Sequence, residues 1–332
     1  MKKICILFGG KSPEHEVSIK SAINVLNAID KSIFEITNIY VGKLGAFYKV
    51  ENINKTEDLN SLETFDINNF KDFDKVFPVM HGPNCEDGKM QGFFETLGVA
   101  YVGPNVLSSA ISMDKDIQKQ IARLNNIKVT NWLAVKKFEF NKKYFEELKN
   151  KINKELSYPV FVKPANMGSS VGIVKVENED ELFNIIEQTF LYDKKIIIEE
   201  AVVGREIEVA VLGKENNLKI SNPGEIKIIG GHDFYDYDAK YLDENGSKTF
   251  IPAESISEEK ILEIKEISKK IYNLLECKDL SRIDFLLKEN GEIVLNEVNT
   301  MPGFTNISMY PKLMEEMGIN YTQLISELLL AE

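Results

Sequence analysis

Residues 282–312 read RIDFLLKENGEIVLNEVNTMPGFTNISMYPK, and this stretch decides the fold and the place of the chemistry. Polar and apolar side chains alternate over 282–287, which is the pattern of a half-buried strand. Residues 289–291, Glu-Asn-Gly, have the composition of a tight turn, and 293–298 form a second strand-like run. The stretch therefore predicts an antiparallel β-hairpin.

The predicted hairpin brings two carboxylates and an amide together. Asp284 falls close to Glu297 on the paired strand, and Asn299 follows Glu297 by one side-chain period on the same face. Their oxygens are hard ligands suited to Mg²⁺ that carries nucleotide phosphates. The other interpretation is a solvated sheet face. Strongly apolar neighbours and the loop NTMPGFT at 299–305, rich in backbone N–H groups, favour the metal site.

Bulk composition limits the classes of protein. A chain of 332 residues accommodates two to three domains, and its 43% hydrophobic content is ordinary for a globular protein. The net charge of −12 argues against nucleic acid or an anionic membrane as a main partner. An anionic substrate must then be met by local lysines and arginines.

Cysteine usage and the start of the chain indicate a cytoplasmic protein. Cys5, Cys85 and Cys277 are too far apart for a disulfide framework or a zinc motif, as expected in a reducing compartment. The opening MKKICILFGG has too short an apolar run for a signal peptide. No apolar run approaches the roughly 20 residues of a membrane span.

The first hundred residues predict an open α/β domain. Residues 3–8 and 34–41 are strand-like and flank a helical stripe, so they form a βαβ unit. Ser12-Pro13-Glu14 resembles a helix start, where free N–H groups can bind a substrate carboxylate. Glu14 can accept from a substrate ammonium, or it can simply complement the helix dipole. A P-loop is excluded because its first glycine would fall at Cys5.

The next strand, 76–80, ends at His81, which is where open α/β sheets place ligands. A lone histidine is more often structural, but this one precedes the helix start at 86–88 and is expected to face the crevice. A metal role for His81 with Cys85 lacks further ligands. We expect a last strand over 98–103 and a domain boundary at Pro104.

The middle of the chain has the features of a phosphate site. A helix over 114–125 carries Lys115 in its first turn, where a cation gains nothing from the helix dipole. A strand over 159–164 contains Lys163 and precedes the small-residue loop 165–172. Such a loop brings its N–H groups close to phosphates. A hairpin turn is the alternative, but eight residues are generous for one.

Four later segments complete the pattern. By spacing alone, 199–206 is a β-hairpin. Residues 230–248 form the longest irregular segment and carry four aromatic side chains, which is typical of a lid. Helices over 257–277 and 321–330 show apolar stripes that serve packing.

Four segments resemble motifs of the D-alanine–D-alanine ligases, in that family's order. They are HGPNCEDGKMQG at 81–92, KPANMGSSVG at 163–172, DFYDYDAKY at 233–241 and NEVNTMPGFTNISMYPKL at 296–313. Together they span nearly the whole chain. One departure is Cys85, where the family usually has glycine.

The resemblance implies an ATP-grasp fold. We expect an α/β chain with an N-terminal open parallel-sheet domain (1–104) that binds substrate. A two-lobed α+β ATP-grasp fold would follow and clamp ATP between antiparallel sheets. Its central lobe is expected at 105–200, and its C-terminal lobe, with the metal and catalytic site, at 201–332.

The resemblance also implies ATP-dependent ligation of two D-alanine molecules through a D-alanyl phosphate, for peptidoglycan precursor synthesis. Two Mg²⁺ ions, for which Mn²⁺ could substitute, would accompany ATP, and the family tends to form homodimers. The implied catalytic residues are Glu14, His81, Ser169, Tyr241, Arg282 and Gly303. The implied ATP-binding residues are Lys115, Lys163, Ser170, Glu199, Glu200, Val202, Glu206 and Lys240. Substrate binding falls to Glu14, His81, Ser308 and Met309, and metal binding to Asp284, Glu297 and Asn299.

Other functions stay open at this point. A related ATP-grasp enzyme could use D-lactate or D-serine as second substrate, or carry out a carboxylation or a different amide ligation. A nucleotide-sensing protein without catalysis is a further class, but sensing does not need the intact set Asp284, Glu297 and Asn299.

Overall fold

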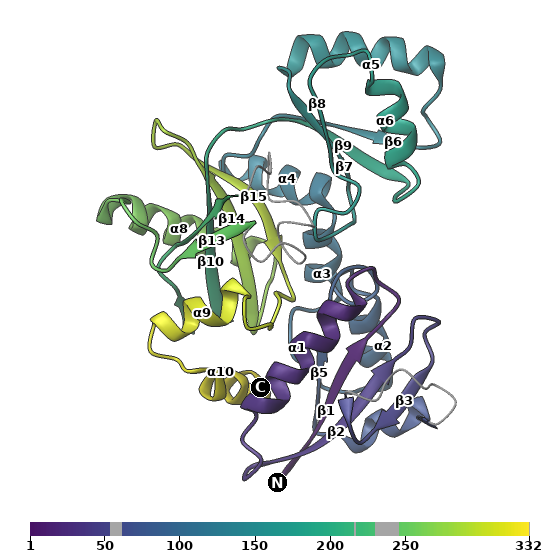
Figure 1. The fold of residues 1–332 in the computed structure, drawn as a ribbon, viewed down its shortest axis with the longest axis vertical. Coiled ribbons are helices and arrows are strands. Elements are labelled where there is room, and N and C mark those ends of the chain that lie inside the picture. The colour runs from purple at the N-terminus through teal and green to yellow at the C-terminus, as the bar shows by residue number, and fades with distance from the viewer. Residues whose placement is uncertain (54–61, 216, 230–245, 332) are drawn as a thin grey trace.

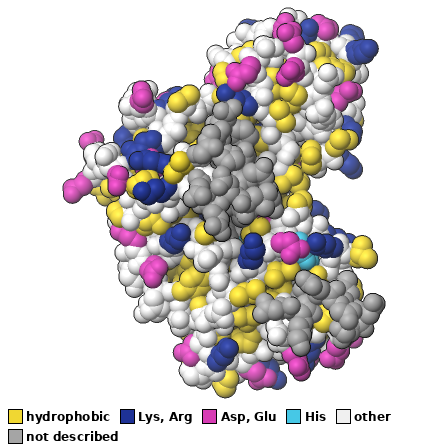
Figure 2. All heavy atoms as spheres, in the orientation of Figure 1, with side chains coloured by type: hydrophobic (Ala, Val, Ile, Leu, Met, Phe, Trp, Pro, Cys, Tyr) yellow, Lys and Arg dark blue, Asp and Glu magenta, His cyan; other side chains and the backbone are white. Residues whose placement is uncertain are grey.

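The computed structural model describes residues 1–53, 62–215, 217–229 and 246–331 (Figure 1). Most of the predicted lid, including Lys240 and Tyr241, lies outside these residues. The chain forms three sheets in succession along the sequence. In Figure 1 they lie at the bottom, at the top and in the middle of the molecule, in chain order. On the visible face, acidic and basic side chains of the described residues are interspersed (Figure 2).

The first sheet has the strand order β4-β3-β2-β1-β5. Its strands are β1 (Lys2–Gly9), β2 (Phe34–Val41), β3 (Phe47–Val50), β4 (Glu63–Thr64) and β5 (Lys75–Val79). β1 pairs in parallel with both β2 and β5, as the predicted βαβ unit requires. The helices of this region are α1 (His15–Ala28), η3 (Ile67–Asp72) and α2 (Lys89–Leu97).

Two local predictions for this region are wrong. Helix α1 begins at His15 with Glu14 as its N-cap, later than the predicted start. The Ser12 hydroxyl instead accepts from the Glu14 N–H at 3.0 Å, which closes a turn before the helix. Over 98–103, Tyr101 forms one parallel bridge to Val76 but no strand. Gly98 and Gly103 have positive φ values of 71° and 109°, a conformation that cannot continue a strand.

The second sheet is entirely antiparallel, in the order β6-β9-β7-β8. Its strands are β6 (Trp132–Lys136), β7 (Val160–Pro164), β8 (Val174–Val176) and β9 (Lys195–Glu200). Helices α5 (Lys142–Glu155) and α6 (Leu182–Thr189) supply the apolar side chains that share one core with the strands, including Leu148 and Ile186.

The third sheet is also antiparallel and follows the order β13-β12-β10-β14-β15, with β11 beside β10. Its strands are β10 (Arg205–Lys214), β11 (Asn217–Ile220), β12 (Gly224–Ile228), β13 (Ser247–Phe250), β14 (Leu280–Leu287) and β15 (Ile293–Asn299). β14 and β15 are the predicted hairpin. Their register pairs Asp284 with Glu297, as expected, and it also pairs Arg282 with Asn299.

Helix α8 (Glu258–Leu274) packs on the third sheet, and so do α3 (Val106–Met113) and α4 (Lys115–Leu124). The spacing-based hairpin over 199–206 is wrong, because β9 and β10 belong to different sheets. β10 pairs with β11, β12 and β14, so 201–204 is a linker between the second and third sheets.

The end of the chain returns to the first sheet. Helices α9 (Met309–Glu316) and α10 (Tyr321–Leu330) share one apolar core with β1, α1 and β5, which includes Phe8, Phe77, Tyr310 and Leu328. Figure 1 shows α10 beside α1. The predicted α/β architecture, an open sheet with a parallel centre followed by two antiparallel sheets, is confirmed. β3 and β4 extend the first sheet in antiparallel pairing, so that sheet is not parallel throughout. Every helix among the described residues is too short or too polar to span a membrane.

Candidate active site

Two adjoining cavities lie where the three sheets meet. The first is lined by Glu14 and His81 from the N-terminal region and by Arg282, Asn299 and the loop 301–309 from the C-terminal region. The second, of about 360 Å³, lies between the second and third sheets. Three residues line both cavities: Gly168, Ser169 and Glu297. A group transferred from one cavity to the other must therefore pass these residues.

Glu14 forms one wall of the first cavity. Its residue is 6% exposed, and its carboxylate accepts a hydrogen bond from the Ser169 hydroxyl. Gly82 and Gly168 leave the space that the carboxylate fills, because a side chain at Gly82 would overlap Glu14 Oε2. The bond joins the phosphate-type loop 165–172 to the first sheet, so the structure brings two predicted site residues together across a large sequence distance.

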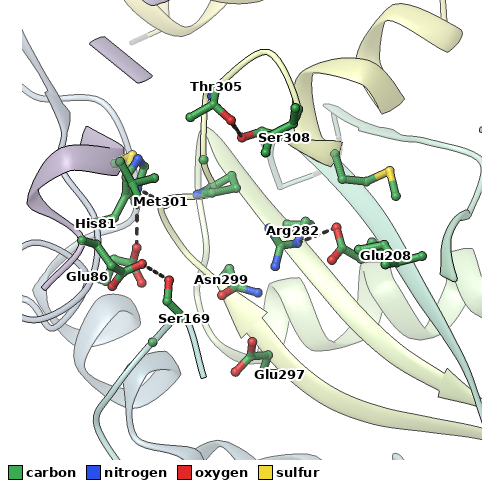
Figure 3. Close-up of a pocket in the computed structure, with 18 of the residues that line it drawn as sticks. His81, Glu86, Ser169, Glu208, Arg282, Glu297, Asn299, Met301, Thr305 and Ser308 are labelled. Atoms are coloured by element: carbon green, nitrogen blue, oxygen red, sulfur yellow. Dashed lines mark hydrogen bonds and ion pairs between the residues drawn. The ribbon is translucent and has the colours of Figure 1, made fainter. Parts of the chain in front are cut away.

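His81 lies two residues beyond the end of β5, between the first sheet and the C-terminal loop. Its Nδ1 is 3.2 Å from the Met301 carbonyl oxygen (Figure 3). Its Nε2 is 2.9 Å from the Ser21 hydroxyl. Burial lowers the pKa of His81 to about 4, although the bond to Met301 partly opposes that shift. The imidazole is therefore neutral at pH 7.

Glu86 is a site residue that the sequence analysis missed. It lines the first cavity beside Glu14, and its Oε1 is 3.8 Å from His81 Nδ1. Burial raises the pKa of Glu86 to about 8, and the charge of Glu14 adds to the effect. The side chain faces the cavity opposite Arg282 in Figure 3. One carboxyl group of this wall is thus protonated near neutral pH.

Arg282 is held by two carboxylates. Its Nε and Nη2 donate to the two oxygens of Asp284 at 2.8 and 2.7 Å. Nε also lies 3.0 Å from Glu208 Oε2 (Figure 3). Burial lowers the pKa of Arg282, but Asp284 and Glu208 outweigh burial and raise it above its usual range. The Asn299 amide also donates to Asp284, at 2.9 Å. Asp284 is thereby placed just behind the lining, while Glu297 and Asn299 face the cavity.

The loop after β15 forms the far wall. The Ser308 hydroxyl accepts from the Thr305 N–H at 3.0 Å and lies 2.8 Å from the Thr305 hydroxyl. A side chain at Gly303 would come within 2.7 Å of Ser308 Oγ, so only glycine fits there. Among the described residues, no group accepts a hydrogen bond from the Gly303 N–H. That donor is left for the cavity.

The second cavity carries two predicted lysines at its inner end. Lys115 Nζ donates to the Met167 carbonyl at 2.8 Å and lies 3.3 Å from Glu297 Oε2. Lys163 forms an ion pair with Glu199. Ser169 and Ser170 of the loop 165–172 both have positive φ, 49° and 58°, so the chain turns sharply over the cavity.

A buried charge cluster beneath this cavity includes Lys119 and Thr130, two further residues that the sequence analysis missed. Lys119 is 2% exposed and lies 2.8 Å from Glu199 Oε2, and both bond to the Thr130 hydroxyl, at 2.7 and 2.9 Å. Burial alone would raise the pKa of Glu199, but Lys119 and Lys163 lower it below its usual range. Glu199 is thus ionised and bridges two lysines.

The outer end of the second cavity is lined by Glu200 at the end of β9, Val202 of the linker and Glu206 at the start of β10. Glu200 accepts from the Asn131 amide and from the Ser157 N–H, both at 3.0 Å, so its side chain is tied to the second sheet. Of the predicted site residues, all but Asp284, Lys240 and Tyr241 line one of the two cavities. The last two lie outside the described residues.

This arrangement of an open sheet, two antiparallel sheets and a lysine-lined cavity between them defines the ATP-grasp class of enzymes. The D-ala D-ala ligase N-terminus family model matches residues 3–104, and the D-ala D-ala ligase C-terminus model matches 121–330. The chain belongs to the D-alanine–D-alanine ligase family.

Individual relatives agree with this assignment. The chain is 46% identical to D-alanine–D-alanine ligase B of Clostridium tetani, over 98% of this chain and 92% of that protein. It is 42% identical to the D-alanine–D-alanine ligase of Oceanobacillus iheyensis, over 99% of this chain and 94% of that protein. Among solved structures, a D-Ala:D-Ser ligase from Enterococcus faecalis has a TM-score of 0.87 at 38% identity, covering 99% of this chain and 98% of that one. The Bacillus anthracis D-alanine–D-alanine ligase complexed with ATP has a TM-score of 0.77 at 28% identity, covering 99% and 96%.

Proposed function

We propose that this protein joins two D-alanine molecules to D-alanyl-D-alanine, at the expense of ATP, for peptidoglycan precursor synthesis. The observation that carries the proposal is the meeting of the two cavities at Ser169 and Glu297. One cavity offers a carboxylate, an arginine and a free N–H, which suits amino-acid substrates. The other offers lysines and a tight loop, which suits a nucleotide.

ATP would occupy the second cavity. Lys115 and Lys163 at its inner end supply positive charge for the phosphates, and the backbone around Ser170 supplies N–H donors. Glu199 and Glu200 at the end of β9 and Val202 of the linker would hold the adenine, and Glu206 the ribose. The predicted phosphate ligand Lys240 belongs to the same proposal. The Bacillus anthracis relative solved with ATP supports it.

Two Mg²⁺ ions, or Mn²⁺, would be held by Asp284, Glu297 and Asn299. No group of three or more His, Cys, Asp or Glu side chains gathers as a metal site within the described part of the chain. The candidate ligands are two carboxylates and one amide on paired strands, and this hard-oxygen set fits a small divalent cation. The ions would neutralise charge on the ATP phosphates.

The chemistry would then run from the second cavity to the first. A carboxylate oxygen of the first D-alanine attacks the γ-phosphorus, and the bond to ADP breaks. The uncharged amine of the second D-alanine attacks the acyl carbon of the resulting D-alanyl phosphate. Phosphate leaves with the electron pair of the C–O bond and takes up the proton that the attacking nitrogen gives up. Arg282 and the Gly303 N–H stabilise the tetrahedral oxyanion.

Glu14 binds the ammonium of the first D-alanine, and His81 forms part of the same wall. Ser169, which bonds to Glu14, connects this wall to the phosphate loop, and Tyr241 would extend the connection. Ser308 and the backbone at Met309 bind the carboxylate of the second D-alanine.

D-serine is a second candidate for the attacking substrate, because the D-Ala:D-Ser ligase from Enterococcus faecalis is so similar in structure. The test is phosphate release from ATP with D-alanine, with L-alanine as the control, followed by mass spectrometry of products from equimolar D-alanine, D-serine and D-lactate. Phosphate release with D-alanine and mainly D-alanyl-D-alanine as product are expected. Mainly D-alanyl-D-serine or ester product would overturn the choice of second substrate.

Three broader features belong to the proposal. The domains 1–104, 105–200 and 201–332 are supported by the sheets, each of which lies within one of these ranges, although α3 and α4 pack on the third sheet. A reducing cytoplasmic location is supported by three buried free thiols, those of Cys5, Cys85 and Cys277. A homodimer rests on the family resemblance and is tested by light scattering.

A further inference from the structure

A network of side-chain hydrogen bonds links helix α1 to the loop that carries Gly303. Ser21, on the buried face of α1, has its hydroxyl 2.9 Å from His81 Nε2 and 3.2 Å from the Phe304 nitrogen. His81 Nδ1 lies 3.2 Å from the Met301 carbonyl oxygen. Ser21 is fully buried and His81 is 4% exposed, so water cannot substitute easily for these partners.

The chemistry of the groups fixes which one donates and which one accepts in each hydrogen bond of this network. A carbonyl oxygen can only accept, so His81 Nδ1 carries the proton that bonds Met301. A neutral imidazole has one N–H, so Nε2 accepts the proton of the Ser21 hydroxyl. The Ser21 oxygen then accepts the N–H of Phe304. Each hydrogen bond of the network therefore has one donor and one acceptor. A proton on Nε2 would break the network, because the Ser21 hydroxyl would lose its acceptor.

We propose that Ser21 and His81 are positioning residues that hold the turn 301–304, and with it the Gly303 N–H, against the first cavity. Met301 is fixed through its carbonyl and Phe304 through its N–H, while Pro302 between them has no N–H. Gly303 thus lies between two anchored residues, with its own N–H left for the cavity. His81 acts through this turn and not as a proton-transfer group, and it keeps the Nδ1–H tautomer.

Neighbouring contacts support this arrangement. Ser18, one turn earlier on the same helix, accepts from the Gly9 N–H at 2.8 Å and donates to the Val79 carbonyl at 2.5 Å. Helix α1 therefore fixes the ends of β1 and β5, and His81 lies two residues after β5. Among the described residues, the charged and titratable groups near the imidazole are Glu86 at 3.8 Å and Arg282. Burial and the positive charge of Arg282 both favour the neutral ring, and the bond to Met301 only partly opposes them.

Activity measurements of variants test the positioning role, which rests on the proposed function. Ser21→Ala removes both contacts and should lower kcat on the order of 100-fold, with KM for ATP unchanged. Ser221→Ala is the matched control, because this buried serine also accepts a backbone N–H, that of Ala210 at 3.0 Å, but lines neither cavity. It should keep wild-type kcat. Equal kcat in Ser21→Ala and wild type would overturn the proposal.

Substitution of the histidine separates positioning from proton transfer. His81→Asn retains an N–H donor near the position of Nδ1 and should keep much more activity than His81→Ala, with a pH–rate profile shaped like that of the wild type. If His81 transferred protons, both variants would lose activity equally and the profile would lose a limb.

A spectroscopic measurement tests the hydrogen-bond network even where a variant folds poorly. The chain has 3 histidines, so ¹⁵N-histidine NMR of the wild-type protein resolves His81 by comparison with His81→Asn. A protonated Nδ1 and an unprotonated Nε2 at pH 7 are expected, and the opposite tautomer would overturn the proposal. Absence of D-alanine-dependent phosphate release in the wild type would instead count against the proposed function. The NMR spectrum would still test the hydrogen-bond network in that case.

Discussion

Lys115 and Glu297 form an ion pair of 3.3 Å at the place where the two cavities join. Lys115 begins α4, whereas Glu297 lies on β15, and the Met167 carbonyl also binds the lysine. A nucleotide that enters the second cavity with its metal would compete with this pair. The lysine would then bind phosphate and the carboxylate the cation, so the pair keeps both groups in place before the substrate arrives.

Glu297→Gln should therefore abolish ligation and leave the fold intact. The amide keeps the shape of the side chain but lacks the charge that binds a divalent cation. We expect turnover to fall by more than about 100-fold, measured as phosphate release at saturating Mg²⁺. Glu292→Gln, on the same hairpin but lining neither cavity, is the control and should keep full activity. Turnover within about tenfold of wild type would exclude a central metal role for Glu297.

Lys119→Met should destabilise the protein and weaken ATP binding. It leaves buried Glu199 with one lysine in place of two, and loss of a partner from a buried ion pair costs about 3–5 kcal/mol. Urea denaturation gives the free energy of unfolding, and the KM for ATP should rise. Lys128→Met is the control, since this lysine pairs with Glu292 at the surface, where an ion pair contributes about 0–1 kcal/mol. Equal stability of the two variants would contradict the role of Lys119.

Gly82→Ala should raise KM for D-alanine at least tenfold or so, because the new methyl group overlaps the Glu14 carboxylate. Gly98→Ala is a close control. Its φ of 71° matches the 72° of Gly82, but nothing lies within 4 Å of the added methyl group. Both variants should lose about 1–2 kcal/mol of stability from backbone strain, and only Gly82→Ala should lose activity. Steady-state kinetics at varied D-alanine checks this, and unchanged KM in both would show that Glu14 can move freely.

Glu86 should make the ligand-free protein less stable as pH rises. Its pKa is about 8 in the folded chain and near 4.5 in an ordinary environment, so between these values the folded state binds more protons than the unfolded state. Stability from this group is complete below about pH 4.5 and is lost as pH rises towards about 8. Glu86→Gln removes the dependence, so its Tm relative to wild type should increase from pH 5 to pH 8. Thermal scans without ligands measure it, and parallel Tm curves would show that Glu86 is ionised throughout.

His81 changes the stability of the folded state with pH in the opposite direction. Its pKa of about 4 lies below the ordinary 6.5, so the unfolded state takes up the proton first as pH falls. The two groups must therefore be separated by comparing variants, since their effects on the wild-type curve oppose each other.

Local patterns were sufficient for most of the fold. The hairpin of β14 and β15 follows from alternation and a turn, and both signals lie within twenty or so residues. The start of α1 was misplaced because Ser12 closes a turn with Glu14 and does not cap the helix. The strand expected at 98–103 failed because composition does not reveal backbone conformation at Gly98 and Gly103.

The site was predictable where family motifs cover it and not where distant segments meet. Lys119 stands in a helix rich in charged residues, and nothing nearby in sequence indicates that it reaches Glu199 on β9. The place of Glu208 in the site could not be predicted either, because only the pairing of β10 with β14 places it opposite Asp284. Glu86 was read as part of a helix start, and its position beside Glu14 arises from tertiary contacts alone.

The core shared by the first sheet and the last two helices has a consequence for synthesis on the ribosome. Phe8 and Phe77 pack with Phe304 and Leu328, so apolar side chains of the first sheet remain uncovered until the end of the chain has been made. The N-terminal segment thus emerges long before its covering helices exist. Nascent chains stalled before α9 should bind chaperones and be cut readily by proteases, whereas the released full-length chain should resist both.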